Sequence, residues 1–179
     1  MAKLFTHIYT FECFLFKYIN QFYKRKLLNT FFHGVTHLGG ASFTISISLL
    51  FIIFSSHSLH TTAIASAVAL TISHIPVALL KKLLPRKRPY LVIEHINVTQ
   101  NPLKDHSFPS GHTTAIFSIV VPFIIFYPTL SILLLPVACA VGLSRIYLGL
   151  HYPSDVIVGC LLGCTAGYVS HAFIHTYFI

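Results

Sequence analysis

The stretch Phe108-Pro109-Ser110-Gly111-His112 stands where a polar segment of the chain gives way to an apolar one. Pro109 predicts the first turn of a helix, where a missing N–H costs nothing. The amides of Ser110, Gly111 and His112 would then be among the free donors of a helix N-terminus, which favours a phosphate group. Glycine lets the backbone approach a ligand, and the histidine can exchange a proton near neutral pH. The stretch predicts an anion site with a proton-active group, or else an ordinary capped helix with a surface histidine.

The composition of the whole chain places this stretch in a membrane protein. Of 179 residues, 55% are hydrophobic and 9% are charged, which leaves too few polar side chains to cover a soluble globule. The 12 Lys and Arg residues are separated by membrane-length apolar runs, so an anionic ligand at a membrane surface is favoured over a nucleic acid. The scattered histidines, cysteines and acids match no metal-site spacing. We expect an all-α integral membrane bundle that uses no metal or other cofactor and binds no nucleic acid.

Five apolar runs have the length expected of membrane-spanning helices. A short polar turn at 56–60 follows the first run, and the long polar segment 81–108 is expected to lie outside the hydrocarbon. Gly159, Gly163 and Gly167 recur every four residues in the last run and predict a smooth ridge on which another helix packs. The runs cover residues 34–55, 61–80, 109–127, 129–148 and 153–173.

Residues 1–30 mix aromatic and aliphatic side chains with Glu12 and Lys17 and end in three consecutive basic residues. This pattern predicts an amphipathic helix that lies in the membrane interface. A further span over 4–22 is the alternative, because one acid and one lysine weaken a span without excluding it. We therefore expect five or six transmembrane helices, divided into an N-terminal interfacial helix, 1–30, and a transmembrane domain, 31–179.

Alternate crossing of the membrane brings the functional candidates to one face, because the second and fourth spans end on the side where the third and fifth begin. That face collects three fixed cations, Lys81, Arg88 and Arg145, with two histidines, His112 and His151. Arginine presents a planar fork to phosphoryl oxygens and lysine a point charge, so these cations can neutralise a phosphoryl-transfer transition state without a metal. The expected site is a phosphate pocket with two proton-active groups.

Asp155 follows His151 by four residues, and Pro153 places Asp155 in the first turn of the last span, within reach of the imidazole. A carboxylate on one ring nitrogen fixes the tautomer and leaves the other nitrogen free to attack. We therefore expect His151 to be a nucleophile and His112 to be the acid that protonates the departing oxygen. The simpler interpretation is that Asp155 only caps its helix, which contributes about 1 kcal/mol.

Three ordered blocks resemble the signature motifs of the type 2 phosphatidic acid phosphatase (PAP2) superfamily. They are Lys81-x6-Arg88-Pro89, Pro109-Ser110-Gly111-His112 and Ser144-Arg145-x5-His151-x3-Asp155. The run Thr36-His37-Leu38-Gly39 also resembles bacterial lipid phosphatases of this superfamily, so the likeness covers about residues 30–175. The resemblance implies a metal-independent phosphatase that works through a phosphohistidine on His151, with His112 as acid and then as the base that activates water.

The resemblance also implies which residues hold the substrate and where the protein works. The phosphate-binding residues would be Lys81, Arg88, Ser110, Gly111, His112 and Arg145. The partner would be a phosphorylated lipid within the bilayer of a bacterial cytoplasmic membrane. Phosphatidylglycerol phosphate, undecaprenyl diphosphate and phosphatidate all stay open, because nothing in 91–105 points to one headgroup. Members with six spans have a further complete helix at the N-terminus, which leaves the span count at five or six.

Two expectations conflict on sidedness. The usual arrangement of the superfamily puts the site on the extracytoplasmic face, whereas the positive-inside rule puts the basic face in the cytoplasm. We follow the superfamily for Lys81, Arg88 and Arg145, because active-site cations do not report topology; the basic residues 24–26 stay unexplained.

Two other functions compete with the phosphatase. A non-catalytic membrane protein would bind anionic lipid or a partner through the same basic face, but it would not need Asp155 together with His112. A metal-dependent hydrolase is disfavoured because four dispersed acids are too few to build a carboxylate site.

Overall fold

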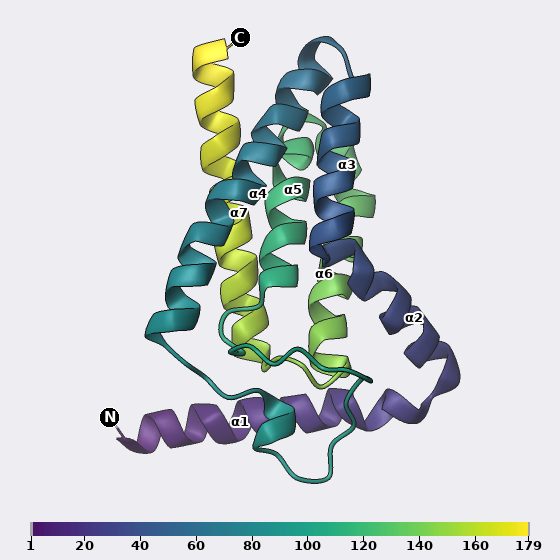
Figure 1. Cartoon of the computed structure of the whole chain (residues 1–179), viewed down its shortest axis with the longest axis vertical. Helices are drawn as coiled ribbons and strands as arrows, with labels where there is room; N and C mark the ends of the chain where they lie inside the picture. Colours follow the sequence, from purple (N-terminus) through teal and green to yellow (C-terminus); the bar gives the residue numbers. More distant parts are fainter. Residues whose placement is uncertain (1, 179) are drawn as a thin grey trace.

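The computed structural model describes residues 2–178, and the side chains from residue 6 to residue 177. Over this range the chain forms helices joined by turns and one long loop, without a strand (Figure 1). The α-helices are α1 (Ala2–Asn20), α2 (Lys26–Thr36), α3 (Ala41–Phe54), α4 (His57–Leu83), α5 (Gly111–Phe126), α6 (Ser131–Tyr147) and α7 (Pro153–Phe178). Short 3-10 helices lie at Gln21–Lys24, His37–Gly39, Pro89–Leu91 and Pro128–Leu130. The expected all-α class is therefore confirmed.

Among the described residues, three helices are long and apolar enough to cross a membrane. They are His57–Leu83, Pro128–Tyr147 and Pro153–Tyr177. The segments Lys26–Gly39 and Ala41–Phe54 qualify together as a fourth, although the chain bends by 55° between them. α5 is apolar but has only 16 residues, somewhat shorter than an ordinary span. The chain is a multi-pass membrane protein, and the count of five or six spans stays a prediction.

Two predicted boundaries were wrong. The expected polar turn at 56–60 is helical from His57 onward, because polar side chains are well tolerated in the exposed first turn of a helix. The segment 1–30 is also not a single helix, since α1 ends at Asn20 and α2 begins at Lys26. Arg25 adopts an extended conformation between them, with φ −76° and ψ 108°, which lets the chain change direction.

α1 runs crosswise beneath the other helices (Figure 1). Glu12, Phe16 and Asn20 are spaced four residues apart, so they share one helix face, and they are buried. Phe11 and Phe14 are exposed elsewhere on the helix. Unlike a soluble amphipathic helix, α1 buries two polar side chains, Glu12 and Asn20, and exposes aromatic ones. An outer surface of this kind suits contact with lipid.

The glycine ridge of α7 packs against α5, as expected. A Cβ atom added to Gly159, Gly163 or Gly167 would come within 2.6–2.7 Å of atoms of α5 or of the residue before it, closer than such atoms can approach. At Gly159 the nearest atom is the backbone oxygen of Ser110, immediately before α5. An alanine there would have to push the two helices apart, at a cost of about 1–3 kcal/mol. The ridge therefore fixes the start of α5 against the first turns of α7.

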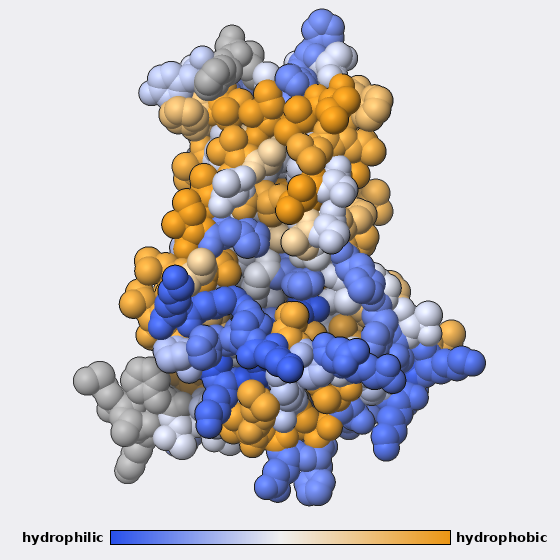
Figure 2. Space-filling model, viewed as in Figure 1, coloured by the Kyte–Doolittle hydropathy of each residue, from blue (hydrophilic) through white to orange (hydrophobic). Residues whose placement is uncertain are grey.

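The surface divides into an apolar part and a polar base. In Figure 2 hydrophobic residues dominate the upper part of the molecule, and hydrophilic residues gather lower down, where Figure 1 places the loop 84–110. Only a small polar area covers the opposite end in this view. The polar base is therefore the place where side chains from several helices can meet an anionic headgroup.

Candidate active site

Every residue that was predicted for the site lies at the base of the bundle. They are Lys81 near the end of α4, Arg88 in the loop 84–110, Ser110, Gly111 and His112 at the start of α5, Arg145 near the end of α6, and His151 and Asp155 at the entrance to α7. Successive helices from α4 to α7 run in alternating directions, so these ends lie at the same end of the molecule (Figure 1).

Arg88 and His151 contact each other at the centre of this cluster. Nη1 of Arg88 lies 3.2 Å from Nε2 of His151 and donates to the carbonyl oxygen of Leu150 at 2.8 Å. The side chains of Arg88 and His151 are each only 1% exposed. Because a guanidinium has donors and no acceptor, Nε2 must accept this hydrogen bond, and the ring proton lies on Nδ1. Nε2 therefore carries its lone pair beside a group that is suited to bind phosphate.

Asp155 lies in the first turn of α7, which begins at Pro153, as the sequence predicts. Its Oδ2 is 3.6 Å from Nδ1 of His151, longer than a hydrogen bond but close enough to stabilise a positive charge on the ring. The same oxygen accepts the backbone N–H of Tyr152 at 2.8 Å and the hydroxyl of Ser107. Asp155 thus stabilises the start of its helix and also faces the imidazole, so the two sequence interpretations are compatible.

The surroundings of His151 keep its imidazole neutral. Burial and the nearby cations Arg88 and Arg145 lower the pKa of His151 to about 4, although Asp155 acts in the opposite direction. The side chain is therefore unprotonated on Nε2 near neutral pH, which is the state that a nucleophile requires.

Asp105 links two of the predicted phosphate-binding cations. Lys81 donates to Oδ2 of Asp105, and Nη2 of Arg88 donates to Oδ1 at 2.6 Å. Burial raises the pKa of this carboxyl, but the hydrogen bonds from Lys81 and Arg88 outweigh burial and lower the pKa to about 2. Asp105 is half exposed, so it lies on the open side of the cluster. A phosphate that binds Lys81 and Arg88 would compete with this carboxylate for the same donors.

The start of α5 differs from the sequence prediction. The helix begins at Gly111, Ser110 is the N-cap, and Pro109 lies outside the first turn. The prediction was wrong because Ser110 takes the N-cap position, where its hydroxyl accepts the first-turn N–H of Thr113, and this leaves Pro109 before the cap. The N–H of Ser110 is also taken, since it donates to the backbone oxygen of Asp155 at 3.0 Å. The amides of Gly111 and His112 are left as the first two of the helix.

Arg145 and His112 complete the cluster. Nη1 of Arg145 donates to the hydroxyl of Thr36 at 2.6 Å, and the arginine is 3% exposed. His112 lies within electrostatic reach of Arg145 and His151. A Cβ added to Gly40 would lie 3.8 Å from Nε2 of His112, so the break between α2 and α3 borders this imidazole. The bend in the first apolar segment therefore contributes to the site.

Several side chains that contact these residues, directly or, for Glu12, through Arg86, were not predicted. They are Glu12, Thr36, Arg86, Asp105 and Ser107. Asp105 offered a usable signal, because an acid in a segment rich in cations needs a partner. Arg86 did not, since the sequence has three consecutive basic residues at 86–88 and does not indicate which of them turns inward.

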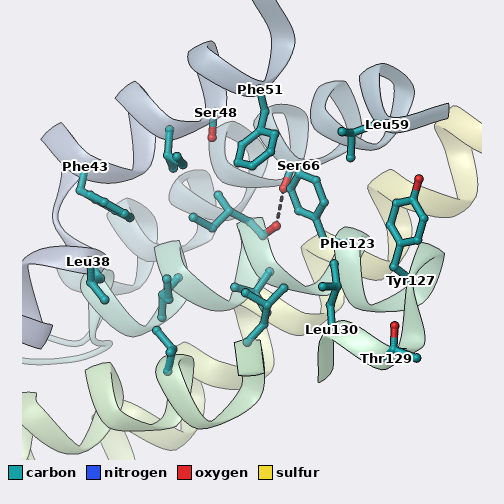
Figure 3. Close-up of a pocket in the computed structure, with 16 residues that line it drawn as sticks. Leu38, Phe43, Ser48, Phe51, Leu59, Ser66, Phe123, Tyr127, Thr129 and Leu130 are labelled. Atoms are coloured by element: carbon teal, nitrogen blue, oxygen red, sulfur yellow. Dashed lines mark hydrogen bonds between the residues drawn. The ribbon is translucent and has the colours of Figure 1, made fainter. Parts of the chain in front are cut away.

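An apolar cavity of about 580 Å³ lies among α3, α4, α5 and α6 (Figure 3). Leu38 lies at one end of it, and Tyr127 lies toward the other. Ile116, which also lines it, follows His112 by one helical turn, or about 6 Å along the axis of α5. The one side-chain hydrogen bond drawn there, from Ser66 to the carbonyl of Ile119, satisfies both groups within the wall. A hydrocarbon environment thus begins close to the cationic cluster.

The chain resembles proteins of one superfamily in sequence and in fold. The family model described as the PAP2 superfamily matches residues 62–179. The bacitracin transport permease protein BcrC of Bacillus licheniformis is 36% identical over 100 residues, which cover 56% of this chain and 49% of that protein. The lipid A 1-phosphatase of Rhizobium etli is 30% identical over 148 residues, which cover 72% of this chain and 64% of that protein.

A solved structure shows the same likeness. The crystal structure of Aquifex aeolicus LpxE matches with a TM-score of 0.77 and 29% identity, covering 87% of this chain and 92% of that one. The chain spans less than two thirds of the length of the curated relatives described above.

Proposed function

This chain belongs to the PAP2 superfamily, and on that basis we propose that it is a membrane lipid phosphatase that works without a metal through a phosphohistidine on His151. The observation that carries the proposal is the contact of Arg88 with Nε2 of His151, with Asp155 facing the other ring nitrogen. A neutral imidazole between a guanidinium and a carboxylate is arranged to attack a phosphoryl group that the guanidinium holds.

In the first step, the substrate phosphate displaces Asp105 and binds Arg88, Lys81 and Arg145, with the first amides of α5 as further donors. Nε2 of His151 attacks phosphorus, and the bond from phosphorus to the leaving oxygen breaks. His112 gives its proton to that oxygen. The ring of His151 then carries positive charge, and Asp155 stabilises that charge from the side of Nδ1.

In the second step, the imidazole of His112, now neutral, takes a proton from a water molecule. The resulting hydroxide attacks phosphorus, the N–P bond breaks, and the electron pair returns to Nε2 of His151. Inorganic phosphate leaves, and both histidines are restored. The three cations neutralise the phosphoryl charge in each step, so no metal is needed for that purpose.

The apolar cavity supports a lipid as substrate, because it offers a hydrocarbon chain a place within one helical turn of His112. The superfamily suggests phosphatidylglycerol phosphate, undecaprenyl diphosphate or phosphatidate, and the Rhizobium relative adds a lipid A phosphate. These substrates share a phosphate or diphosphate joined to long apolar chains, which is the chemistry that the cluster and the cavity fit.

The function is tested by measuring the phosphate that the purified chain releases from its substrates in detergent with a metal chelator present. The panel contains the four lipids and glycerol 3-phosphate, which has a phosphate ester without a chain. We expect hydrolysis of at least one lipid, unchanged by the chelator and faster than that of glycerol 3-phosphate. Loss of turnover on chelation would point to a metal-dependent enzyme. Failure to hydrolyse any lipid would favour a protein that only binds anionic lipid.

We also propose that the chain crosses a bacterial cytoplasmic membrane five times, with α2 and α3 as one bent crossing and α5 as a short one, and that α1 lies in the interface. The site then lies on the extracytoplasmic face. The contacts of the cations support this sidedness. Lys81 and Arg88 pair with Asp105, and Arg145 donates to Thr36. Because these cations serve the site, they do not determine the orientation of the chain in the membrane.

Sidedness is tested with a membrane-impermeant thiol reagent on intact cells, in a chain whose four native cysteines are replaced by alanine. We expect labelling of a cysteine introduced by Gln100→Cys, in the loop at the base, and none of one introduced by Ser58→Cys, at the opposite end of the bundle. The reverse pattern would place the site in the cytoplasm, in agreement with the positive-inside rule.

A further inference from the structure

Arg86 joins the site to α1. Its Nη1 donates to Oδ1 of Asp155 at 2.9 Å and to the hydroxyl of Ser154 at 2.8 Å. Its Nη2 donates to Oε1 of Glu12. The guanidinium carbon also lies 3.8 Å from the centre of the Tyr152 ring, which adds a cation–π contact. Arg86 is therefore held by groups of both the first turn of α7 and the crosswise helix.

Glu12 uses both of its carboxylate oxygens in this arrangement. Oε1 accepts from Arg86, and Oε2 accepts from the hydroxyl of Ser154. The residue is only 8% exposed, and a buried carboxylate is costly unless it is paired. Glu12 is thus positioned to hold Arg86 against the start of α7, although it lies outside the motifs that carry the family resemblance.

The two carboxylate oxygens of Asp155 have different partners. Oδ1 accepts from Arg86, while Oδ2 faces Nδ1 of His151 and accepts from Ser107 and the N–H of Tyr152. If the guanidinium were absent, Oδ1 would lose its charged partner, and only the neutral donors on Oδ2 would hold the carboxylate. In the part of the chain that the structure describes, Arg86 has no hydrogen bond to His151, so its effect on the nucleophile passes through Asp155.

The charge on Arg86 is secure. Burial lowers the pKa of the guanidinium, but Asp155 and Glu12 raise it to a net value above the ordinary one. The group is a permanent cation between two carboxylates, and its exposed neighbour Lys87 is not part of this arrangement.

We propose that Arg86 is a positioning residue that fixes the carboxylate of Asp155 toward His151, and that Glu12 of α1 holds Arg86 in place. The proposal rests on the proposed function, because the histidine must act as a nucleophile for its orientation to matter. The interfacial helix is then part of the catalytic unit, and the division of the chain at residue 30 separates residues that act together.

The test compares Arg86→Gln, Arg86→Lys and Glu12→Gln with the wild-type chain on a lipid from the panel. Arg86→Gln should lower kcat about 10–100-fold with little change in KM, the range typical for loss of a group that orients a ligand or catalyst. Arg86→Lys should recover part of the loss, because a point charge can reach Asp155 but cannot also serve Glu12 in the same geometry. Glu12→Gln should lower kcat less than Arg86→Gln. Lys87→Gln and Glu94→Gln are matched controls, since both alter an exposed charge, and they should keep the wild-type kcat.

A double-variant comparison separates positioning from a general structural role. If Arg86 acts through Asp155, adding Arg86→Gln to Asp155→Asn should cost little more than Asp155→Asn alone. Multiplicative losses would overturn the proposal, as would a rise in KM at constant kcat, which would make Arg86 a phosphate-binding residue. Thermal unfolding in detergent identifies variants that lose activity because they lose the fold.

A measurement without substrate keeps the proposal testable if the wild-type chain hydrolyses no lipid, an outcome that would count against the proposed function alone. Nitrogen-15 NMR of labelled histidine reports which ring nitrogen of His151 carries the proton. The wild-type chain should show the proton on Nδ1, and Arg86→Gln should shift His151 toward a mixture of tautomers. An unchanged His151 signal in Arg86→Gln would reject the positioning role regardless of activity.

Discussion

Replacing His151 with alanine is expected to abolish phosphate release, by at least about 10⁴-fold, the scale on which loss of a covalent nucleophile acts. The side chain removed is the one whose Nε2 carries a lone pair next to Arg88. No covalent intermediate can then form, because the protein lacks the atom that accepts the phosphoryl group. Rapid-quench trapping of acid-labile phosphoprotein from radiolabelled lipid measures this directly, and the His151→Ala chain should stay unlabelled.

Two controls make the result interpretable. The alanine variant removes a buried ring and leaves Arg88 without this acceptor, so its thermal unfolding must be compared with that of the wild-type chain. His151→Gln is a second variant that fills more of the space and retains a polar group beside Arg88. If either folded variant still trapped labelled phosphate, another residue would be the nucleophile and the role assignment would be wrong.

Replacing His112 with alanine is expected to slow both chemical steps by about 10² to 10⁴, the usual loss on removal of a general acid or base. The first step suffers because the leaving oxygen departs without a proton, and the second because water is not activated. An aryl phosphate whose leaving group needs no proton should recover much of the first step. Rapid-quench experiments should therefore show labelled protein that forms quickly from the aryl phosphate and then persists.

His106→Ala is the matched control for His112→Ala, because its imidazole is exposed in the loop beside the site. It should keep wild-type rates with both substrates. The assignment of His112 as proton donor would fail if His112→Ala were impaired equally on the lipid and on the activated ester. That pattern would instead fit a histidine that binds phosphate.

The sequence predicted the main contacts of the site because several of them follow from local geometry. Pro153 starts α7 and puts Asp155 in its first turn, so the approach of Asp155 to His151 follows from a spacing of four residues. Helices of alternating direction brought Lys81, Arg88 and Arg145 to one end. The glycines of α7 predicted a close helix contact without identifying α5 as the partner.

The parts that sequence did not predict depend on contacts between distant segments. Glu12 looked like a defect in an apolar helix, and only the crosswise position of α1 brings it to Arg86. Thr36 accepts a hydrogen bond from Arg145, 109 residues away in the chain, and the 55° bend between α2 and α3 lies at Gly39 and Gly40, which were not used to predict a bend. The start of α5 was predicted too early, with Pro109 in the first turn instead of Ser110 at the N-cap, since both residues are common at helix starts.

The glycine ridge has a consequence for how this sequence can diverge. Along α7, Ile157 and Leu161 are 60% exposed toward the surroundings, so exchanges among apolar side chains should accumulate there freely. Gly159 lies between them and Gly163 follows them, and both contact the start of α5 so closely that even a methyl group must move the segments of the candidate site apart. In a library of all single substitutions, positions on the exposed face of α7 should therefore tolerate many residues, and positions on the glycine face should tolerate few. Evolutionary drift would follow the same period, with the lipid-facing positions variable and the glycines nearly invariant.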